Sequence, residues 1–462
     1  MLHKVVPVGL FISTQVILAY ATLQNTDSSR TIHTEVVIIG GGATGTYAAV
    51  RLREDLNTSV MLVEPKDHLG GSVSTYTVPE TNTTVEYGVQ SYVRNQAAMD
   101  FYARFGVKTQ PSAARRLTTV NVDVETGAQL KEYLPPTSLS LNPDTGDFLQ
   151  AQDIPTDLLT RVEDFVAKHH LEAAVPRIEA ISGIGYGGIR HLLTFNLMQA
   201  FGATLTRQVL DNELLVPVGS NSLIYQRALA LLADDVLLST TIRHIERDSE
   251  RVHLLVSKGD EKYTIHAKRI LFTAPPSLSA LAPYKLDAQE EEVFQQWTVD
   301  GQWIGVARID CIHENYSINY IPSAAVPNNQ LSTKEWPFSL RLDSTGPPGL
   351  NLFRVVMGAN YTISSEEYKR LVVEGVQKIS QAGTVECNCT VDFEAMSDHT
   401  RPVWKQSAEQ LQAGFVQDLY ALQGHRGMWY TGSVWGAPYS STLWNFTDTV
   451  LPKLLADIGQ AN

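Results

Sequence analysis

The hydrophobic pattern is clearest near the start of the chain, where two short apolar runs flank a segment with helical spacing. Thr34–Ile39 ends in four consecutive β-branched residues, which predicts a strand buried on both faces, as in a parallel sheet. Residues 46–56 carry Ala and Leu at helical spacing, and 59–63 are again mostly apolar, so we predict a β-α-β unit. Farther along, alternating polar and apolar residues predict a hairpin from 252–256 and 263–267.

A glycine-rich turn with the spacing G-x-G-x-x-G joins the first predicted strand to the helix. Gly40 permits the tight turn, Gly42 lets a pyrophosphate approach the backbone, and Gly45 lets helix and strand pack closely. The helix N-terminus offers N–H groups and a positive dipole to phosphates. Glu64 ends the second strand, where an acid can bind a pair of ribose hydroxyls. The motif predicts a dinucleotide-binding site that also includes Ala43 and Thr44.

The segment after this predicted ribose acid resembles the same segment of the flavin-containing amine oxidases. Gly70 and Gly71 match the glycine pair of that family, whereas His68 and Ser72 stand where the family carries arginines. The other segments that resemble the family are 85–90 with Gly88, 216–223, 236–242 with Ile242, 270–276, 427–433 with Gly432 and Ser433, and a helix from 440 that includes Thr442 and Leu443.

The resemblance implies an α/β fold with a Rossmann-like FAD-binding domain assembled from three segments, plus an α+β substrate domain. It places the FAD-binding domain at 31–92, 210–280 and 425–460, and the substrate domain at 93–209 and 281–424. No internal repeat or low-complexity linker interrupts these blocks.

The last predicted helix begins near Ser440, ends about Asp457, and has Ser441 as a suitable N-cap. In the family, this helix directs its N-terminus at the flavin pyrimidine, where its dipole stabilises negative charge on the reduced ring. Its opening string, S-S-T-L-W-N-F-T, resembles that of secreted fungal FAD oxidoreductases.

The resemblance also implies an FAD enzyme that takes a hydride from a C–H bond and passes electrons to O₂ or another acceptor. Amine oxidases carry a lysine near flavin N5, but no lysine lies between Lys285 and Lys334, and Gly305 stands at the aligned position. This favours dehydrogenation of a specialised metabolite, with or without oxidative ring closure. The alternatives are a polyamine or L-amino-acid oxidase, a flavin-dependent isomerase, and a protein that binds flavin without turnover.

Several histidines are candidates for chemistry. His68 either bonds covalently to the flavin 8α-methyl carbon or replaces an arginine as a hydrogen-bonding group. His169 and His170 lack a third ligand at metal-site spacing, so we predict a solvated helix end and no metal there.

Four further residues are candidates for contact with flavin or substrate. Tyr186 and Arg190 belong to a Gly-rich turn that either lines the substrate cavity or caps a helix. Trp404 and Trp435 either face the flavin or belong to the core. The candidates to hold an acidic or enol substrate are Arg401 and His399.

The N-terminus has the pattern of a secretory signal peptide, which we place at 1–21. Lys4 precedes an apolar run over 5–18, and small residues follow up to Ala21. The alternative is an uncleaved N-terminal anchor, although the run is short for a membrane span. No second long apolar run follows, so we expect no membrane anchor after cleavage. The sequons that would fit a secreted glycoprotein are Asn57, Asn82, Asn315, Asn360, Asn388 and Asn445.

The composition and charge of the chain limit the classes of partner that we expect. The chain is 44% hydrophobic and 18% charged, which is typical of a globular protein. Its net charge is −13 without a basic tract, which argues against a nucleic-acid partner and leaves a small-molecule substrate. The three cysteines leave one thiol unpaired, and Cys311 can bridge to either Cys387 or Cys389.

Overall fold

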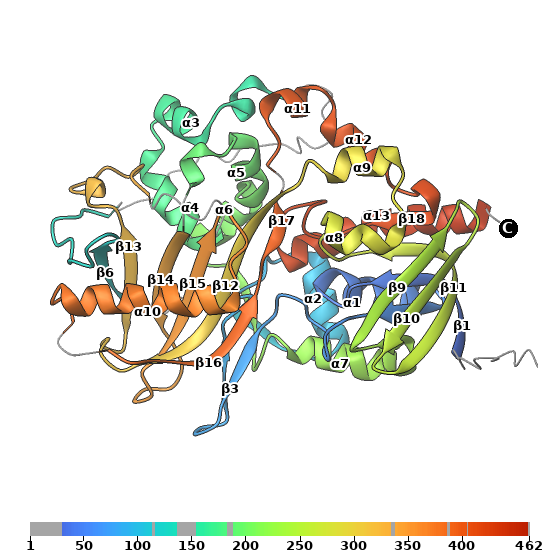
Figure 1. The fold of residues 1–462 in the computed structure, drawn as a ribbon, viewed down its shortest axis with the longest axis horizontal. Helices are drawn as coiled ribbons and strands as arrows, with labels where there is room; N and C mark the ends of the chain where they lie inside the picture. The colour runs from blue at the N-terminus through green and yellow to red at the C-terminus, as the bar shows by residue number, and fades with distance from the viewer. Residues whose placement is uncertain are drawn as a thin grey trace, which may run out of the picture.

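A computed structural model describes residues 30–112, 116–135, 154–182, 188–333, 338–385, 389–403 and 405–460. Two seven-stranded sheets lie side by side, and helices cover both (Figure 1). Within these residues, no helix is long and apolar enough to cross a membrane. The predicted signal peptide, Tyr186, Trp404 and the sequon at Asn388 lie outside the described residues.

The first sheet has a parallel part and an antiparallel part that share one long strand. The parallel strands lie in the order β8 (Val236–Leu237), β2 (Val60–Val63), β1 (Arg30–Ile39), β11 (Glu261–Phe272) and β18 (Met428–Tyr430). β10 (Val252–Lys258) and β9 (Thr240–Arg247) extend the first half of β11 as an antiparallel meander. The predicted β-α-β unit and the predicted hairpin are therefore confirmed as parts of one sheet.

The segment 236–242, whose resemblance to the family implies one strand, is divided into β8 and β9, so that expectation is wrong. Ser239 takes a left-handed conformation, with φ 53°, and turns the chain between the two strands. Its N–H donates to Lys66 O at 2.8 Å, and Thr240 N–H donates to Glu64 O at 3.0 Å. The break thereby brings the start of β9 beside the end of β2.

The second half of β1, residues 36–39, is buried on both faces, as its apolar run predicts. Val36 and Ile38 belong to the core under α1, α2, α7 and α13, whereas Val37 and Ile39 belong to the core under α9, α11 and α12. These helices are α1 (Ala43–Val50, with a π-helical turn over Arg51–Asp55), α2 (Gln96–Arg104), α7 (Leu223–Leu232), α9 (Ala288–Phe294), α11 (Ala408–Gln412), α12 (Phe415–Ala421) and α13 (Ser440–Gln460). Helices α2, α9, α11 and α12 thus cover the first sheet, although the predicted boundaries assigned them to the substrate domain.

The second sheet is mostly antiparallel. Its strands lie in the order β16 (Val391–Asp398), β12 (Thr298–Ile309), β15 (Leu352–Ala359), β14 (Phe338–Ser344), β13 (Tyr316–Ile321) and β6 (Thr118–Asp123), with β17 (Arg401–Val403) paired to β12. The long helix α10 (Ser365–Gln381) covers one face of this sheet (Figure 1). A disulfide between Cys311 and Cys389 links the segment after β12 to the segment before β16, which decides the pairing left open by the sequence.

A group of short helices lies above the second sheet in Figure 1 and has its own apolar core. Its members are α3 (Val162–His169), α4 (Val175–Ser182), α5 (Thr194–Ala200) and α6 (Ala203–Leu210). The remaining elements are β3 (Thr75–Val78), β4 (Thr83–Glu86), β5 (Thr109–Pro111), β7 (Leu215–Pro217) and α8 (Leu278–Leu281).

Candidate functional site

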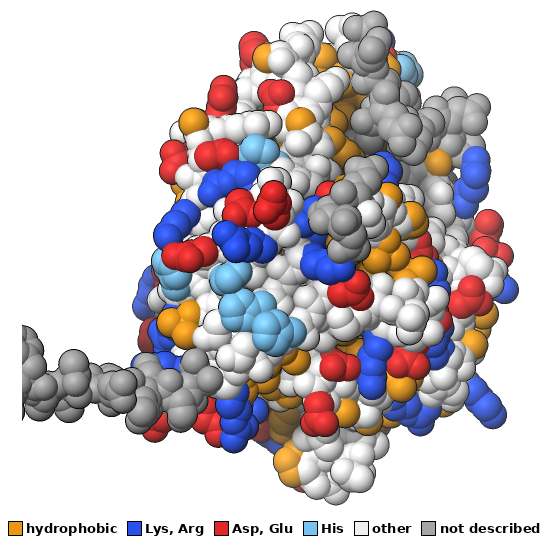
Figure 2. Space-filling view, turned by 90° about the vertical axis from the view of Figure 1, so that its right-hand side faces the viewer, with side chains coloured by type: hydrophobic (Ala, Val, Ile, Leu, Met, Phe, Trp, Pro, Cys, Tyr) orange, Lys and Arg blue, Asp and Glu red, His pale blue; other side chains and the backbone are white. Residues whose placement is uncertain are grey.

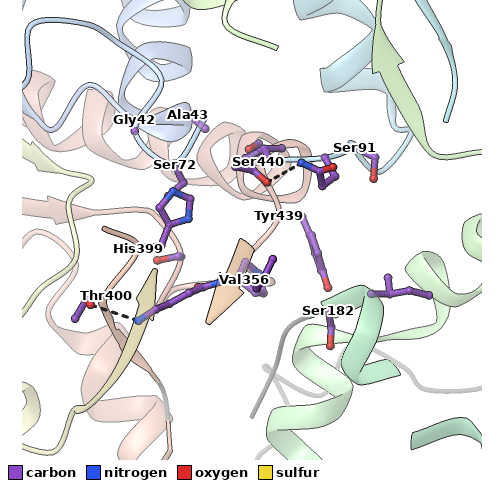
Figure 3. A pocket seen from close by; sticks show the side chains of 18 of the residues that line it. Gly42, Ala43, Ser72, Ser91, Ser182, Val356, His399, Thr400, Tyr439 and Ser440 are labelled. Atoms are coloured by element: carbon purple, nitrogen blue, oxygen red, sulfur yellow. Dashed lines mark hydrogen bonds between the residues drawn. The ribbon is translucent and has the colours of Figure 1, made fainter. Parts of the chain in front are cut away.

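A cavity of about 1290 Å³ lies where the first sheet, the second sheet and the helical group meet. Its walls include the carboxyl ends of β1 and β2, the start of β9, one surface of β13, β14 and β15, and parts of α4 and α6. Ligands of open α/β sheets bind outside the carboxyl ends of the strands, so the cavity lies where the glycine motif predicts a cofactor. Figure 3 shows Gly42 and Ala43 at one end of this space and Ser182 and Thr400 toward the other.

Most residues predicted to hold the cofactor line this cavity. They are Gly40, Gly42, Ala43, Thr44, Glu64, Gly70, Gly71, Ser72, Gly88, Ile242, Ser433 and Leu443. The fold therefore brings segments from both ends of the chain to one wall.

The glycine turns approach each other closely at this wall. Gly70 N–H donates to Gly41 O at 2.8 Å, and a Cβ on Gly71 would lie 2.8 Å from the Cα of Gly42. The first helical bond of α1 runs from Thr46 N–H to Gly42 O at 3.0 Å. The N–H groups that precede Thr46 therefore have no partner within the helix and are available to an anion.

Glu64 is buried at the end of β2, and both of its carboxylate oxygens are positioned by the backbone. Oε2 accepts a hydrogen bond from Gly41 N–H at 2.5 Å, and Oε1 accepts one from Lys66 N–H at 2.8 Å. The carboxylate is thus held in one orientation beside the phosphate turn, as a ribose-binding acid requires.

Between the cofactor end and the substrate end of the cavity, Gln302 of β12 and His399 after β16 lie next to each other. His399 N–H donates to Gln302 O at 2.8 Å, and His399 Nε2 lies 3.5 Å from Ser74 Oγ. His399 is the only histidine among the described residues that line the cavity. Figure 3 shows its ring next to Ser72, so an ionisable group lies at the junction of the cofactor end and the substrate end.

A network of charges forms the floor of the substrate end. Asp343 accepts hydrogen bonds from Ser317 Oγ at 2.6 Å and from Arg341 Nη2 at 2.6 Å. Arg354 lies 3.9 Å from the same carboxylate and donates from Nε to Tyr87 O at 2.8 Å. Ser317, Arg341, Asp343 and Arg354 line the cavity, whereas Tyr87 does not. Their hydrogen bonds hold the polar groups of the cavity floor in fixed positions.

Next to the cavity wall, a second acid, Glu86, is half-buried and hydrogen-bonded. Burial raises the pKa of the Glu86 carboxyl, and hydrogen bonds from Thr75, Ser220 and Asn221 oppose this rise. Thr75 Oγ1 donates to Glu86 at 2.8 Å and Asn221 N–H donates at 3.1 Å. Through these hydrogen bonds, Glu86 links β4 to the turn before α7. This link supports the part of the cavity wall that contains Gly88.

Comparisons with known proteins agree with this geometry. Residues 38–105 match the family of NAD(P)-binding Rossmann-like domains. FAD-dependent oxidoreductase pigF of Monascus ruber is 31% identical, over 92% of this chain and 93% of that protein. Beta-cyclopiazonate dehydrogenase of Aspergillus flavus is 28% identical, over 97% of this chain and 98% of that protein.

The chain belongs to the FAD-dependent oxidoreductases.

Solved structures support the same fold. A fatty acid isomerase from P. acnes has a TM-score of 0.69 at 16% identity, covering 91% of this chain and 98% of that one. A putrescine oxidase has a TM-score of 0.60 at 15% identity, covering 92% of this chain and 100% of that one. The predicted amine-oxidase-like fold is confirmed.

The cavity of this oxidoreductase fits FAD. The close backbones at Gly42 and Gly71 suit a pyrophosphate, Glu64 suits the ribose, and Ile242 lines the adenine end expected from the resemblance. The flavin supplies hydride acceptance, and the protein supplies orientation and electrostatics.

Three predicted cofactor residues shape the site without lining the cavity. A Cβ on Gly45 would lie 1.9 Å from Gly40 O, which agrees with its predicted role in helix packing. Gly432 has φ 126° and packs against Thr273. Thr442 Oγ1 donates to Tyr439 O at 2.8 Å and thereby links the first turn of α13 to the residue before it. The predicted cap, Ser441, is instead fully buried inside that helix.

Other predicted site residues lie away from the cavity. The His68 side chain is 56% exposed, because the chain around it turns outward before Gly70. Its Nδ1 atom lies 2.6 Å from Asp67 Oδ1. Arg190 lies within the 3₁₀ turn Ile189–His191, 3.8 Å from Glu163, and does not line the cavity. Trp435 is fully buried and stacks on Tyr430, with ring centroids 5.0 Å apart, so it is a core residue.

Sequence reasoning missed the residue of β12 that faces the cavity. Gly305, aligned with the family lysine, packs against Ala395 O and the Tyr368 hydroxyl and does not line the cavity. Gln302 lines it instead. The odd spacing between these positions places them on opposite faces of the strand, and only the pairing with β15 and β16 reveals which face is which. Tyr439 was also missed, although it directly precedes the recognised helix motif.

Proposed function

We propose that this chain is a secreted FAD-dependent dehydrogenase that oxidises a specialised metabolite, with or without ring closure, by hydride transfer to the flavin. The observation that carries the proposal is the pair Gln302 and His399 on the cavity wall formed by β12 and the segment after β16, where the described lining residues include no lysine. Lys66 is the only lysine among the described residues that line the cavity, and it lies at the cofactor end. The name of beta-cyclopiazonate dehydrogenase supports the substrate class.

Each part of the site has a role in this reaction. The glycine turns and Glu64 would hold FAD, and the N-terminal end of α13, at Ser440 and Leu443, would offer the positive end of its dipole to the bound cofactor. Bound FAD would supply acceptance of the substrate hydride and transfer of the electrons to O₂ or another acceptor. His399 Nε2 would take the proton of the neighbouring N–H, O–H or C–H bond and release it to solvent.

The shape of the cavity favours a substrate larger than a simple amine. FAD fills the end defined by Glu64 and Ile242, and the remaining space extends to α4 and α6. The fixed pattern of two arginines, Arg341 and Arg354, around Asp343 would orient a polar substrate.

Anaerobic mixing of the holoenzyme with candidate substrates tests the proposal. We expect beta-cyclopiazonate to bleach the visible flavin band, and putrescine, an L-amino acid and an unsaturated fatty acid to leave it unchanged. Bleaching by putrescine or the amino acid would instead establish an oxidase, and a shifted double bond in the fatty acid would establish an isomerase. If none of these probes reacts, the chain is a dehydrogenase of another metabolite or a flavin-binding protein. Bleaching of the flavin band by a fungal metabolite extract would then indicate a dehydrogenase, and an unchanged band would indicate a flavin-binding protein.

A variant pair assigns the proton acceptor. We expect His399→Ala to slow flavin reduction by about 100-fold while FAD remains bound. His313→Ala, which removes an exposed histidine distant from the cavity lining, should leave the rate unchanged. Equal rates in both variants would exclude His399.

A further inference from the structure

Three histidines form a row across the outer surface of the antiparallel part of the first sheet. His33 of β1 pairs in register with His266 of β11, which in turn pairs with His253 of β10. Glu246 of β9 continues the row, opposite His253. Figure 2 shows pale-blue histidine side chains gathered on this end of the molecule.

The row faces solvent because strand side chains alternate. Val252 and Leu254, which flank His253, are buried, and so are Ile265 and Ala267, which flank His266. The histidines therefore lie on the opposite side of the strands from the core, and none of them lines the FAD cavity.

The imidazole rings are already in contact. The rings of His33 and His266 stack with centroids 4.9 Å apart at an interplanar angle of 14°. The rings of His253 and His266 meet edge to face with centroids 4.4 Å apart. His266, on the middle strand, is directly paired with both His33 and His253, and directly paired residues have Cβ atoms roughly 5 Å apart. An ion bound by all three would therefore lie over His266, with the two outer rings turned toward it.

The nitrogens of this row are unused by the protein. Within the described residues, no hydrogen bond to a ring nitrogen of His33, His253 or His266 is present. In contrast, His68 bonds Asp67 and His425 bonds Asp287. A row of contacting imidazoles with free nitrogens needs either water or an ion as a partner.

The flanking charges are largely compensated: Glu246 lies 3.9 Å from Lys285 and 3.3 Å from His244, and Lys268 lies 3.5 Å from Glu35.

We propose that His33, His253 and His266 form a site for one divalent transition-metal ion of the zinc, copper or nickel class. Imidazole nitrogens select these metals over magnesium or calcium, which prefer oxygen ligands. The ion would link β1, β11 and β10, and thereby stabilise the meander whose strand β9 carries Ile242 into the FAD cavity.

A second cluster has closer ligand atoms but is already occupied by cations. The ligand atoms of Asp287, Glu290 and His425 lie within 4.8 Å of one another. Arg247 donates to both Glu290 oxygens at 2.7 Å, and Arg426 lies 3.2 Å from Glu290. These guanidinium groups neutralise the carboxylates, so this cluster competes poorly for a metal.

Calorimetric titration of the untagged, chelator-treated holoenzyme with ZnCl₂ and CuCl₂ tests the proposal. We expect one equivalent to bind, and His266→Ala to weaken binding by at least about tenfold. The Cu²⁺ complex should show nitrogen hyperfine structure in its EPR spectrum that His266→Ala removes. The matched control is a variant with His169→Ala and His170→Ala, which removes another pair of histidines and should bind as tightly as the parent.

Three results would overturn the site. They are unchanged affinity in His266→Ala, no saturable binding by the parent, and loss of binding in His425→Ala instead. If His266→Ala loses its flavin spectrum or its folded circular dichroism, the exposed His33→Ala takes its place with the same expected loss. Zinc should also raise the melting temperature of the parent and not that of the histidine variant, because an ion that binds only the folded state stabilises it.

Discussion

At the scale of single residues, Glu64 links the cofactor to the fold. Its spacing from the glycine turn predicts a contact with ribose, and the structure adds that Oε2 accepts from Gly41 N–H at 2.5 Å. The same carboxylate therefore fixes the phosphate turn. This second role is invisible in the sequence, because it depends on the separation between the ends of β1 and β2.

We predict that Glu64→Gln weakens FAD binding by roughly tenfold, because it removes a charge-assisted hydrogen bond and a ribose acceptor. Fluorescence titration of the apoprotein with FAD measures the dissociation constant. Glu35→Gln is the control, since Glu35 accepts from Ser59 N–H at 3.2 Å, far from the cavity. Similar constants for the two variants would remove Glu64 from the cofactor site.

His68 gives a second prediction at this scale. Because its ring is exposed and paired with Asp67, we expect FAD to be held without a covalent bond. Acid precipitation should leave a yellow supernatant, and His68→Ala should give the same result. A yellow pellet that becomes colourless in His68→Ala would show instead that the ring turns inward and bonds to the flavin.

At the scale of elements, the sequence predicts those strands and turns whose signal is local. The apolar run of β1 and the glycine spacing after it require no distant partner to be recognised. The break between β8 and β9 at Ser239, the face of β12 that bears Gln302, and the sheet that α2 covers all depend on tertiary pairing. Residue patterns therefore identify the cofactor wall and leave the substrate wall undetermined.

Helix α13 is anchored to the first sheet by a partly buried ion pair. Arg269 of β11 donates to both oxygens of Asp457, at 2.7 and 2.9 Å, and Trp429 Nε1 donates to Oδ2 at 2.9 Å. The hydrogen bonds from Arg269 hold the pKa of the Asp457 carboxyl below its ordinary value. A lowered folded-state pKa stabilises the protein above the unfolded-state value, and the contribution is lost as pH falls through the folded-state value.

We predict that Asp457→Asn destabilises the holoenzyme by about 2 kcal/mol at neutral pH, because Arg269 stays buried with a weaker partner. The difference from the parent should persist down to about pH 4 and shrink below it. Urea unfolding at a series of pH values measures this. Asp418→Asn, on an exposed face of α12, should show no such difference, and a pH-independent loss in Asp457→Asn would mean that charge is not involved.

At the scale of the whole molecule, the cavity is a product of long-range assembly. Its cofactor wall comes from both ends of the chain, and its floor comes from β13, β14 and β15 of the other sheet. Four sequons, at Asn57, Asn82, Asn315 and Asn360, are exposed on the surface of this assembly. The disulfide between Cys311 and Cys389 closes a loop in the second sheet and is typical of an oxidising compartment.

These surface features lead to a prediction about the route of the protein. Full-length chain expressed in a fungal host should appear in the medium with Thr22 as its first residue, since we expect cleavage after Ala21. Glycosidase treatment should lower its mass, with glycans on exposed asparagines such as Asn57, Asn82 and Asn315, where φ is positive and the chain turns. Asn445 serves as the internal contrast, because it lies within α13 and we expect it to stay unmodified. Protein that keeps Met1 and sediments with membranes would establish the N-terminal anchor instead, and a cleaved but unglycosylated product would limit the prediction to the signal peptide.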